Sequence, residues 1–146
     1  MTHANASKVE SKSCKGRILL VDDERDIADS LGIGLRLNGY EVSIYNDPRE
    51  AVKGFEPNSF DAAVIDIGMP GMNGFELYRR LRAADKKIKI CFLTAFDMHG
   101  PEFNRVFPEV EISSFMTKPM SVSQFVQNVE RVLAGKAPQS QVSGGS

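Results

Sequence analysis

Short apolar runs alternate with amphipathic stretches through the middle of this chain. Runs rich in aliphatic and β-branched residues occupy 17–21, 41–45, 62–66, 88–94 and 112–118. Apolar runs of this length are typical of strands buried on both faces of a sheet. The stretches between them carry apolar residues at helical spacing. The alternation predicts one α/β domain, a (βα)5 doubly wound, flavodoxin-like fold whose parallel sheet has the strand order 2-1-3-4-5.

Capping residues mark where the predicted helices begin. Asp47 is followed by Pro48, which suits an N-cap and the first helical position. Asn73 and Ser121 each stand three residues before a Glu or Gln, the spacing of a capping box. The first helix is predicted over 26–38, and Gly39 closes it. The fourth is predicted to be short, about two turns within 96–111, because Pro101 and Pro108 interrupt that segment.

Length and composition fit one domain with polar ends. The 146 residues suit a single domain over 16–135, with a disordered tail at 1–15 and a tail or the start of a linker at 136–146. No apolar run approaches the ~18 residues of a spanning helix. The net charge of -1 shows no strongly basic arm for nucleic acid. Cys14 and Cys91 lie in unlike surroundings, so no disulfide is expected and the protein is predicted to be cytoplasmic.

Polar side chains stand at the carboxyl ends of the predicted strands. Asp22 and Asp23 follow the first strand, Asp66 ends the third, Thr94 ends the fourth and Lys118 ends the fifth. Carboxyl ends of parallel strands share one edge, and ligands of open α/β sheets bind there, where the strand order reverses. The three aspartates are therefore expected to converge in one cleft, with the threonine and lysine on neighbouring strands.

The chemistry of this predicted cluster favours Mg²⁺ and a phosphoryl group. Carboxylates packed together repel one another unless a cation lies among them. The available ligands are hard oxygens, which suit Mg²⁺. An ionised Asp66 can attack phosphorus to give an acyl phosphate. The turn formers Gly68, Pro70 and Gly71 would keep a tight loop open beside it, with a backbone carbonyl in reach of the metal.

Four segments, taken in order, resemble the receiver domain of two-component response regulators. They are "ILLVDDERD", "AAVIDIGMPGMNGFEL", "CFLTAF" and "FMTKPM", and with the helices between them they cover about 17–134. The resemblance implies that Asp66 is the phosphoacceptor, charged from a phosphohistidine of a sensor histidine kinase or phosphotransfer domain. It implies that Asp23 binds Mg²⁺ directly, that Asp22 does so mainly through water, and that Gly68 offers its backbone carbonyl.

The same resemblance assigns the phosphate contacts and a switch. Lys118 would pair with the phosphoryl group, Thr94 would hydrogen-bond it, and the small Ala95 would leave room for it. Phe115 matches the aromatic switch position, and its ring is expected to turn inward when Thr94 moves toward the phosphate. That motion would change the face of helix four, strand five and helix five. Phe115 has no hydroxyl, so it would gate by packing alone.

The first predicted helix carries apolar residues on two sides. Ile27, Leu31 and Leu35 form one stripe, while Ile33 and Leu37 lie off it. The favoured interpretation is packing against the last helix. The alternative is a docking surface for a kinase phosphotransfer domain.

Four functions are compatible with the sequence to different degrees. The first is a phosphorylatable receiver, a signalling protein rather than an enzyme apart from its own aspartyl phosphorylation and dephosphorylation. A haloacid-dehalogenase-like phosphohydrolase would need a second acid where Gly68 stands. A flavodoxin-like nucleotide binder would need a phosphate loop where three acids stand. A pseudo-receiver that only binds partners is the remaining alternative. No DNA-binding motif follows residue 134, so the output is expected either in sequence not shown or through protein contact, with a homodimer on phosphorylation as one form of it.

Overall fold

A parallel five-stranded sheet forms the centre of the structure. This computed structural model describes residues 14–69, 71–94 and 115–136. The sheet order is β2-β1-β3-β4-β5, and every neighbouring pair is parallel. Both features of the predicted sheet are thereby confirmed. The strands are β1 (Gly16–Val21), β2 (Tyr40–Tyr45), β3 (Ala62–Asp66), β4 (Lys89–Thr94) and β5 (Phe115–Thr117).

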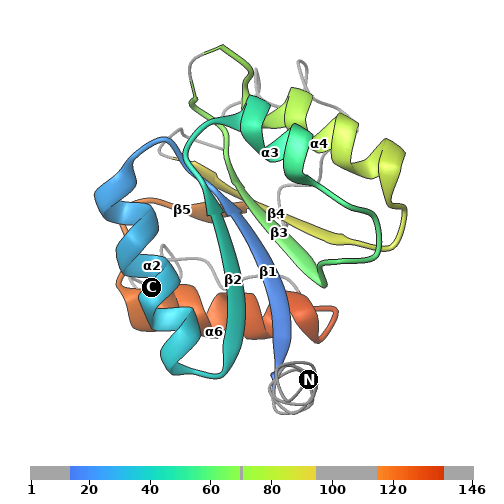
Figure 1. The fold of residues 1–146 in the computed structure, drawn as a ribbon. Coiled ribbons are helices and arrows are strands. Elements are labelled where there is room, and N and C mark those ends of the chain that lie inside the picture. The colour runs from blue at the N-terminus through green and yellow to red at the C-terminus, as the bar shows by residue number, and fades with distance from the viewer. Residues whose placement is uncertain (1–13, 70, 95–114, 137–146) are drawn as a thin grey trace, which may run out of the picture.

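Helices cover both faces of the sheet, as a doubly wound fold requires. Helices α2 (Arg25–Leu37) and α6 (Val122–Leu133) lie on one face, and α3 (Pro48–Gly54) and α4 (Gly74–Ala84) lie on the other (Figure 1). Alternate residues of the strands feed two separate cores: Leu19 and Val21 pack toward α3 and α4, while Ile18 and Leu20 pack toward α2 and α6. The predicted short helix within 96–111 and the start of the predicted fifth strand lie outside the described residues.

The predicted caps hold the helix starts. The Asp47 carboxylate accepts a hydrogen bond from the Arg49 amide, and Asn73 accepts from the amides of Phe75 and Glu76. Ser121 and Gln124 form a complete capping box at the start of α6. Each such cap is worth about 1 kcal/mol of stability. These caps fix where α4 and α6 begin, next to the carboxyl ends of β3 and β5.

The inner stripe of α2 packs as predicted at two of its three residues, while Ile27 is 38% exposed. Leu31 and Leu35 are buried in the core shared with α6, and a methyl group at Gly34 would collide with Val122 at the start of α6. Ile33 and Leu37 remain 54% and 82% exposed. Packing against the last helix therefore accounts for the buried stripe but leaves these two side chains uncovered by the described residues. No helix in the described parts of the chain has the length and apolar content to span a membrane.

Candidate functional site

Asp66 ends β3 and is held by the loop that follows it. Its carboxylate is buried, and its Oδ1 accepts a hydrogen bond from the Gly68 amide at 3.2 Å. The Gly74 amide donates to the Ile67 carbonyl, which folds the loop back onto the strand end. A Cβ at Gly74 would lie 2.6 Å from the Asp66 carbonyl oxygen, so only glycine fits there. Gly71 has φ +86°, a conformation that glycine adopts without strain. The turn formers therefore shape the backbone around the acid.

Asp22 and Asp23 follow β1 and lie beside Asp66. Asp22 is fully buried, and its Oδ1 accepts a hydrogen bond from the Glu24 amide at 3.0 Å. Its backbone is fastened to the end of β2, because its amide donates to the Tyr45 carbonyl and its carbonyl accepts from Asn46 Nδ2 at 2.8 Å. These bonds fix the direction of the buried carboxylate.

The three aspartates form a group that fits a divalent cation. Each of Asp22, Asp23 and Asp66 offers a carboxylate oxygen, and these oxygens lie within 4.8 Å of one another. The buried Asp22 Oδ2 has no hydrogen-bond partner among the described residues. A buried carboxylate oxygen without a hydrogen bond is costly, and a bound divalent cation would add to the compensation that the Lys118 ammonium supplies from 3.1 Å. An all-oxygen donor set suits Mg²⁺ better than a softer metal.

Lys118 brings a positive charge to the same cluster. Its Nζ lies 2.7 Å from Glu24 Oε1, 3.1 Å from Asp22 Oδ2 and 3.4 Å from Asp66 Oδ2. The contact with Asp22 is an ion pair whose geometry does not make a hydrogen bond. The Lys118 amide donates to the Thr94 carbonyl, which fixes the start of its side chain at the end of β5. The ammonium therefore faces several carboxylates at once.

Burial and neighbouring charges shift the acid–base properties of the site. Burial and the nearby Asp22 carboxylate raise the pKa of Asp66 to about 6, although Lys118 and the Gly68 amide act against this rise. Burial disfavours the charged form of Lys118, but Glu24, Asp22 and Asp66 together outweigh it and raise the pKa of its ammonium. Lys118 therefore stays protonated at neutral pH, while the ionised form of Asp66 is disfavoured by its surroundings.

The predicted convergence of acids, threonine and lysine at one edge of the sheet is confirmed. Thr94 ends β4 and is buried, and its partner in the register with β5 is Thr117, next to Lys118. Ala95 lies outside the described residues. Gly68 is in the loop as predicted, and its amide donates to Asp66.

Phe115 is already inside the core in this structure. The side chain is 5% exposed, with its ring stacked on Phe92 at 5.1 Å between centroids and edge-on to Phe75 at 6.2 Å. The sequence predicts a ring that turns inward in response to a moving Thr94, and in this structure the ring occupies the inward position. An aromatic cluster that includes the first residues of α4 supplies a physical reason for that position.

Sequence reasoning missed two residues that shape the site. Asn46 stands directly after β2, and its amide group anchors the backbone of Asp22. The sequence could have indicated Asn46, because it is the polar residue at the carboxyl end of the second strand. The aspartates hold the same position at the first and third strands. Glu24 stands in the sequence as one acid in a row of three. Its contact with Lys118 joins residues 94 positions apart, and no local pattern signals it.

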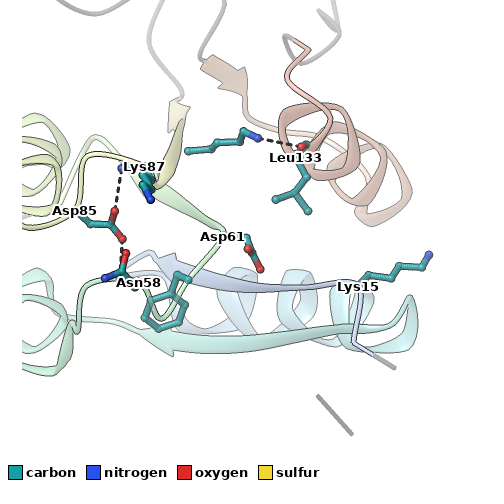
Figure 2. Close-up of a pocket in the computed structure, with 8 residues that line it drawn as sticks. Lys15, Asn58, Asp61, Asp85, Lys87 and Leu133 are labelled. Atoms are coloured by element: carbon teal, nitrogen blue, oxygen red, sulfur yellow. Dashed lines mark hydrogen bonds between the residues drawn. The ribbon is translucent and has the colours of Figure 1, made fainter. Parts of the chain in front are cut away.

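A cavity lies at the amino edge of the sheet, away from Asp22, Asp23 and Asp66. It has a volume of about 400 Å³ and is lined by Lys15, Asn58, Phe60, Asp61, Asp85, Lys87, Lys89 and Leu133. Figure 2 shows Asp85 between Asn58 and Lys87, whose amides both donate to its carboxylate. These bonds lower the pKa of Asp85 and tie two loops together. The Asp85 carboxylate of this cavity is thus occupied by backbone amides, whereas the cluster of three aspartates lies at the other edge of the sheet.

Comparison with known proteins gives one family. The sequence profile of the response regulator receiver domain matches residues 18–130. The transcriptional regulatory protein PrrA of Mycobacterium tuberculosis is 34% identical over 117 residues, which are 80% of this chain and 49% of PrrA. The response regulator MprA of Mycolicibacterium vanbaalenii is 31% identical over 122 residues, which are 84% of this chain and 52% of MprA. The chain spans about half the length of these curated relatives.

Solved structures agree with the sequence comparison. The non-phosphorylated HemR receiver domain of Leptospira biflexa matches with a TM-score of 0.72 at 32% identity, covering 86% of this chain and 99% of that one. A CheY-like receiver domain protein of Methanospirillum hungatei matches with a TM-score of 0.71 at 27% identity, covering 82% of this chain and 94% of that one.

Proposed function

This chain belongs to the response regulator receiver family, and on that premise we propose that it accepts a phosphoryl group on Asp66 from a phosphohistidine of a sensor kinase or phosphotransfer domain. A carboxylate oxygen of Asp66 attacks phosphorus, the P–N bond of the donor breaks, and its electron pair stays on the imidazole nitrogen. The observation that carries the proposal is the placement of a buried Asp66 beside two further carboxylates and the Lys118 ammonium.

Each neighbour of Asp66 has a role in this transfer. The Lys118 ammonium stabilises the charge on the phosphoryl oxygens, and the Thr94 hydroxyl donates a hydrogen bond to one of them. Ala95, which the structure does not describe, leaves room for the group by its small size. Preorganised donors of this kind act mainly in the transition state, because charge gathers on those oxygens as the donor bond breaks.

Asp22, Asp23 and Asp66, with the backbone carbonyl of Gly68, would hold Mg²⁺. Asp23 would bind it directly and Asp22 mainly through water. When bound, the ion neutralises part of the negative charge that a phosphoryl group brings to these acids. The buried Asp22 Oδ2 supports this assignment, since it accepts no hydrogen bond from the described residues and has room for a divalent cation beside its ion pair with Lys118.

Phosphorylation would act through Phe115 and the face near it. This ring packs on Phe92 and Phe75, so a change at Thr94 would be passed to that aromatic cluster. The face that we propose for a downstream partner consists of β5, α6 and the segment between β4 and β5. A homodimer on phosphorylation would use the same face. Ile33 and Leu37 on α2 are the proposed contact with the kinase.

The alternative function is a phosphorylation-independent pseudo-receiver. The haloacid-dehalogenase-like and nucleotide-binding alternatives are not favoured, because the family match is to receiver domains. Receiver domains are signalling proteins rather than enzymes in the usual sense, so the chemistry proposed here is confined to Asp66 itself.

Intact mass after incubation with acetyl phosphate tests the proposal. The wild-type chain should gain one phosphoryl group with Mg²⁺ and none with EDTA, and Asp66→Asn should gain none. Acyl phosphates can turn over quickly, so binding of beryllofluoride is measured in parallel. A folded wild type that shows neither product would contradict the proposal and favour the pseudo-receiver.

A further inference from the structure

The closest partner of Lys118 is not one of the aspartates. Its Nζ lies 2.7 Å from Glu24 Oε1 but 3.4 Å from Asp66 Oδ2. The Lys118 side chain is 15% exposed and the Glu24 side chain is 55% exposed, so Glu24 stands on the rim of the site while Asp66 is inside it. Among the described residues, the ion pairs of Lys118 are with these two acids and Asp22. The ammonium is therefore drawn toward the rim as well as toward the phosphoacceptor.

Helix formation does not explain a glutamate at position 24. Glu24 is the N-cap residue of α2, where Ser, Thr, Asp and Asn are preferred because their short side chains cap the first amides. The Glu24 side chain makes no such capping bond. The Glu24 amide donates a hydrogen bond to Asp22 Oδ1, and the Glu24 carboxylate accepts one from Lys118 Nζ.

We propose that Glu24 is a positioning residue that holds Lys118 at the rim before phosphorylation and releases it when the phosphoryl group forms on Asp66. This inference rests on the proposed function. The Asp66 oxygen forms its bond to phosphorus while the donor's bond breaks, and the electron pair of that bond leaves with the donor. The phosphoryl oxygens then offer Lys118 a stronger partner than Glu24, and the ammonium moves inward.

The contact has a kinetic consequence. An ion pair that exists in the resting state and is lost in the transition state raises the barrier by the energy of that pair. Removing the contact should therefore speed phosphorylation. Because the pair is partly exposed, its removal is expected to speed the reaction about three- to five-fold.

Three variants separate the contact from its charge. Glu24→Gln removes the charge and the ion pair. Glu24→Asp keeps the charge but is one methylene too short to keep the 2.7 Å contact. Asp26→Asn removes an exposed acid two positions further along the same segment, and it is the control for the general loss of negative charge. The rate of phosphorylation by acetyl phosphate is measured by intact mass at saturating Mg²⁺, because the chain has no tryptophan to report it. Beryllofluoride affinity and urea unfolding are measured on the same variants.

The expected result is a distinct order of rates. Glu24→Gln and Glu24→Asp should both react about three- to five-fold faster than wild type and bind beryllofluoride more tightly by a similar factor. Asp26→Asn should stay within about two-fold. A slower Glu24→Gln would show that Glu24 aims Lys118 at the phosphate, which overturns the proposal. A Glu24→Asp variant with the wild-type rate would show that the charge at position 24 matters and the contact with Lys118 does not. A Glu24→Gln variant with the same rate as Asp26→Asn would show only a general effect of negative charge. Either result overturns the proposal. If wild type takes up neither phosphoryl group nor beryllofluoride, the proposed function itself fails.

Discussion

Asp66 is the residue on which the chemistry depends, and its surroundings set its charge. Burial and Asp22 raise the pKa of this carboxyl to about 6, well above that of an exposed aspartate. Burial disfavours the ionised carboxylate of Asp66. It also removes water from the carboxylate oxygens, which leaves them more available to attack phosphorus. Lys118 and a divalent cation are the two charges that would make it reactive without exposing it to water.

The raised pKa makes a prediction about stability. The folded state binds a proton at Asp66 more tightly than the unfolded chain does, so ionisation costs stability as the pH rises from about 4 to about 6. In EDTA at pH 7.5, Asp66→Asn should therefore be more stable than wild type by roughly 1–3 kcal/mol, and the difference should shrink at pH 4. Urea unfolding at both pH values measures this.

Two comparisons make the stability experiment decisive. Asp29→Asn, which removes an exposed acid of α2, should show no comparable gain. Added Mg²⁺ should stabilise wild type more than Asp66→Asn and narrow the difference. An Asp66→Asn variant that is less stable than wild type at pH 7.5 in EDTA would mean that the ion pair with Lys118 outweighs burial.

At the scale of the elements, the site depends on where strands end and helices begin. The strand order, the caps at Asp47, Asn73 and Ser121, and the meeting of the acids could all be predicted, because each follows from local chemistry or from the geometry of parallel strands. The contacts of Asn46 and Glu24 could not, since they depend on which way a side chain turns after the backbone is fixed.

The start of α4 gives a prediction at this scale. A methyl group at Gly74 would meet backbone atoms, the Asp66 carbonyl oxygen at 2.6 Å and the Ile67 Cα at 2.8 Å, and backbone cannot move aside as a side chain can. Gly74→Ala should cost about 1–3 kcal/mol of stability and slow phosphorylation of Asp66, because the strand end must shift. Urea unfolding and the acetyl phosphate assay measure the two effects.

Gly71 offers the matched control for that substitution. It has φ +86° and open space around an added Cβ. Because asparagine tolerates this backbone conformation, Gly71→Asn should cost less than about 1 kcal/mol of stability. If Gly74→Ala were as mild as Gly71→Asn in both assays, the close approach of α4 to β3 would not matter for the site.

Over the whole molecule, the two edges of the sheet carry different polar groups, and the helices that cover its faces differ in their exposed side chains. The carboxyl edge gathers the acids and Lys118, while the cavity at the amino edge has its Asp85 bonded to backbone amides. On the face covered by α2 and α6, the outer side of α2 carries exposed apolar side chains, including Ile33. The inward position of Phe115 could not be predicted from sequence, because it depends on how rings from three separate elements pack together.

The exposed side of α2 predicts a separation between kinase transfer and small-donor chemistry. Ile33→Asp changes a side chain that is 54% exposed and should alter stability by no more than about 0.5 kcal/mol. Phosphorylation by acetyl phosphate should be unchanged, while transfer from a kinase that phosphorylates the wild-type chain should fall at least ~10-fold, since a charge would enter an apolar contact. Leu31→Asp, in the buried stripe of the same helix, should instead unfold the domain. Normal transfer to a folded Ile33→Asp would place the docking contact elsewhere.

The central claim, that Asp66 is the residue that carries the phosphoryl group, is tested most directly by trapping the acyl phosphate. Borohydride reduces an aspartyl phosphate to homoserine, which peptide mass mapping can locate in the chain. After acetyl phosphate and Mg²⁺, we predict homoserine at position 66 and unmodified aspartate at Asp22 and Asp23. Homoserine at either of those positions, or at none in a chain that has bound phosphate, would contradict the account.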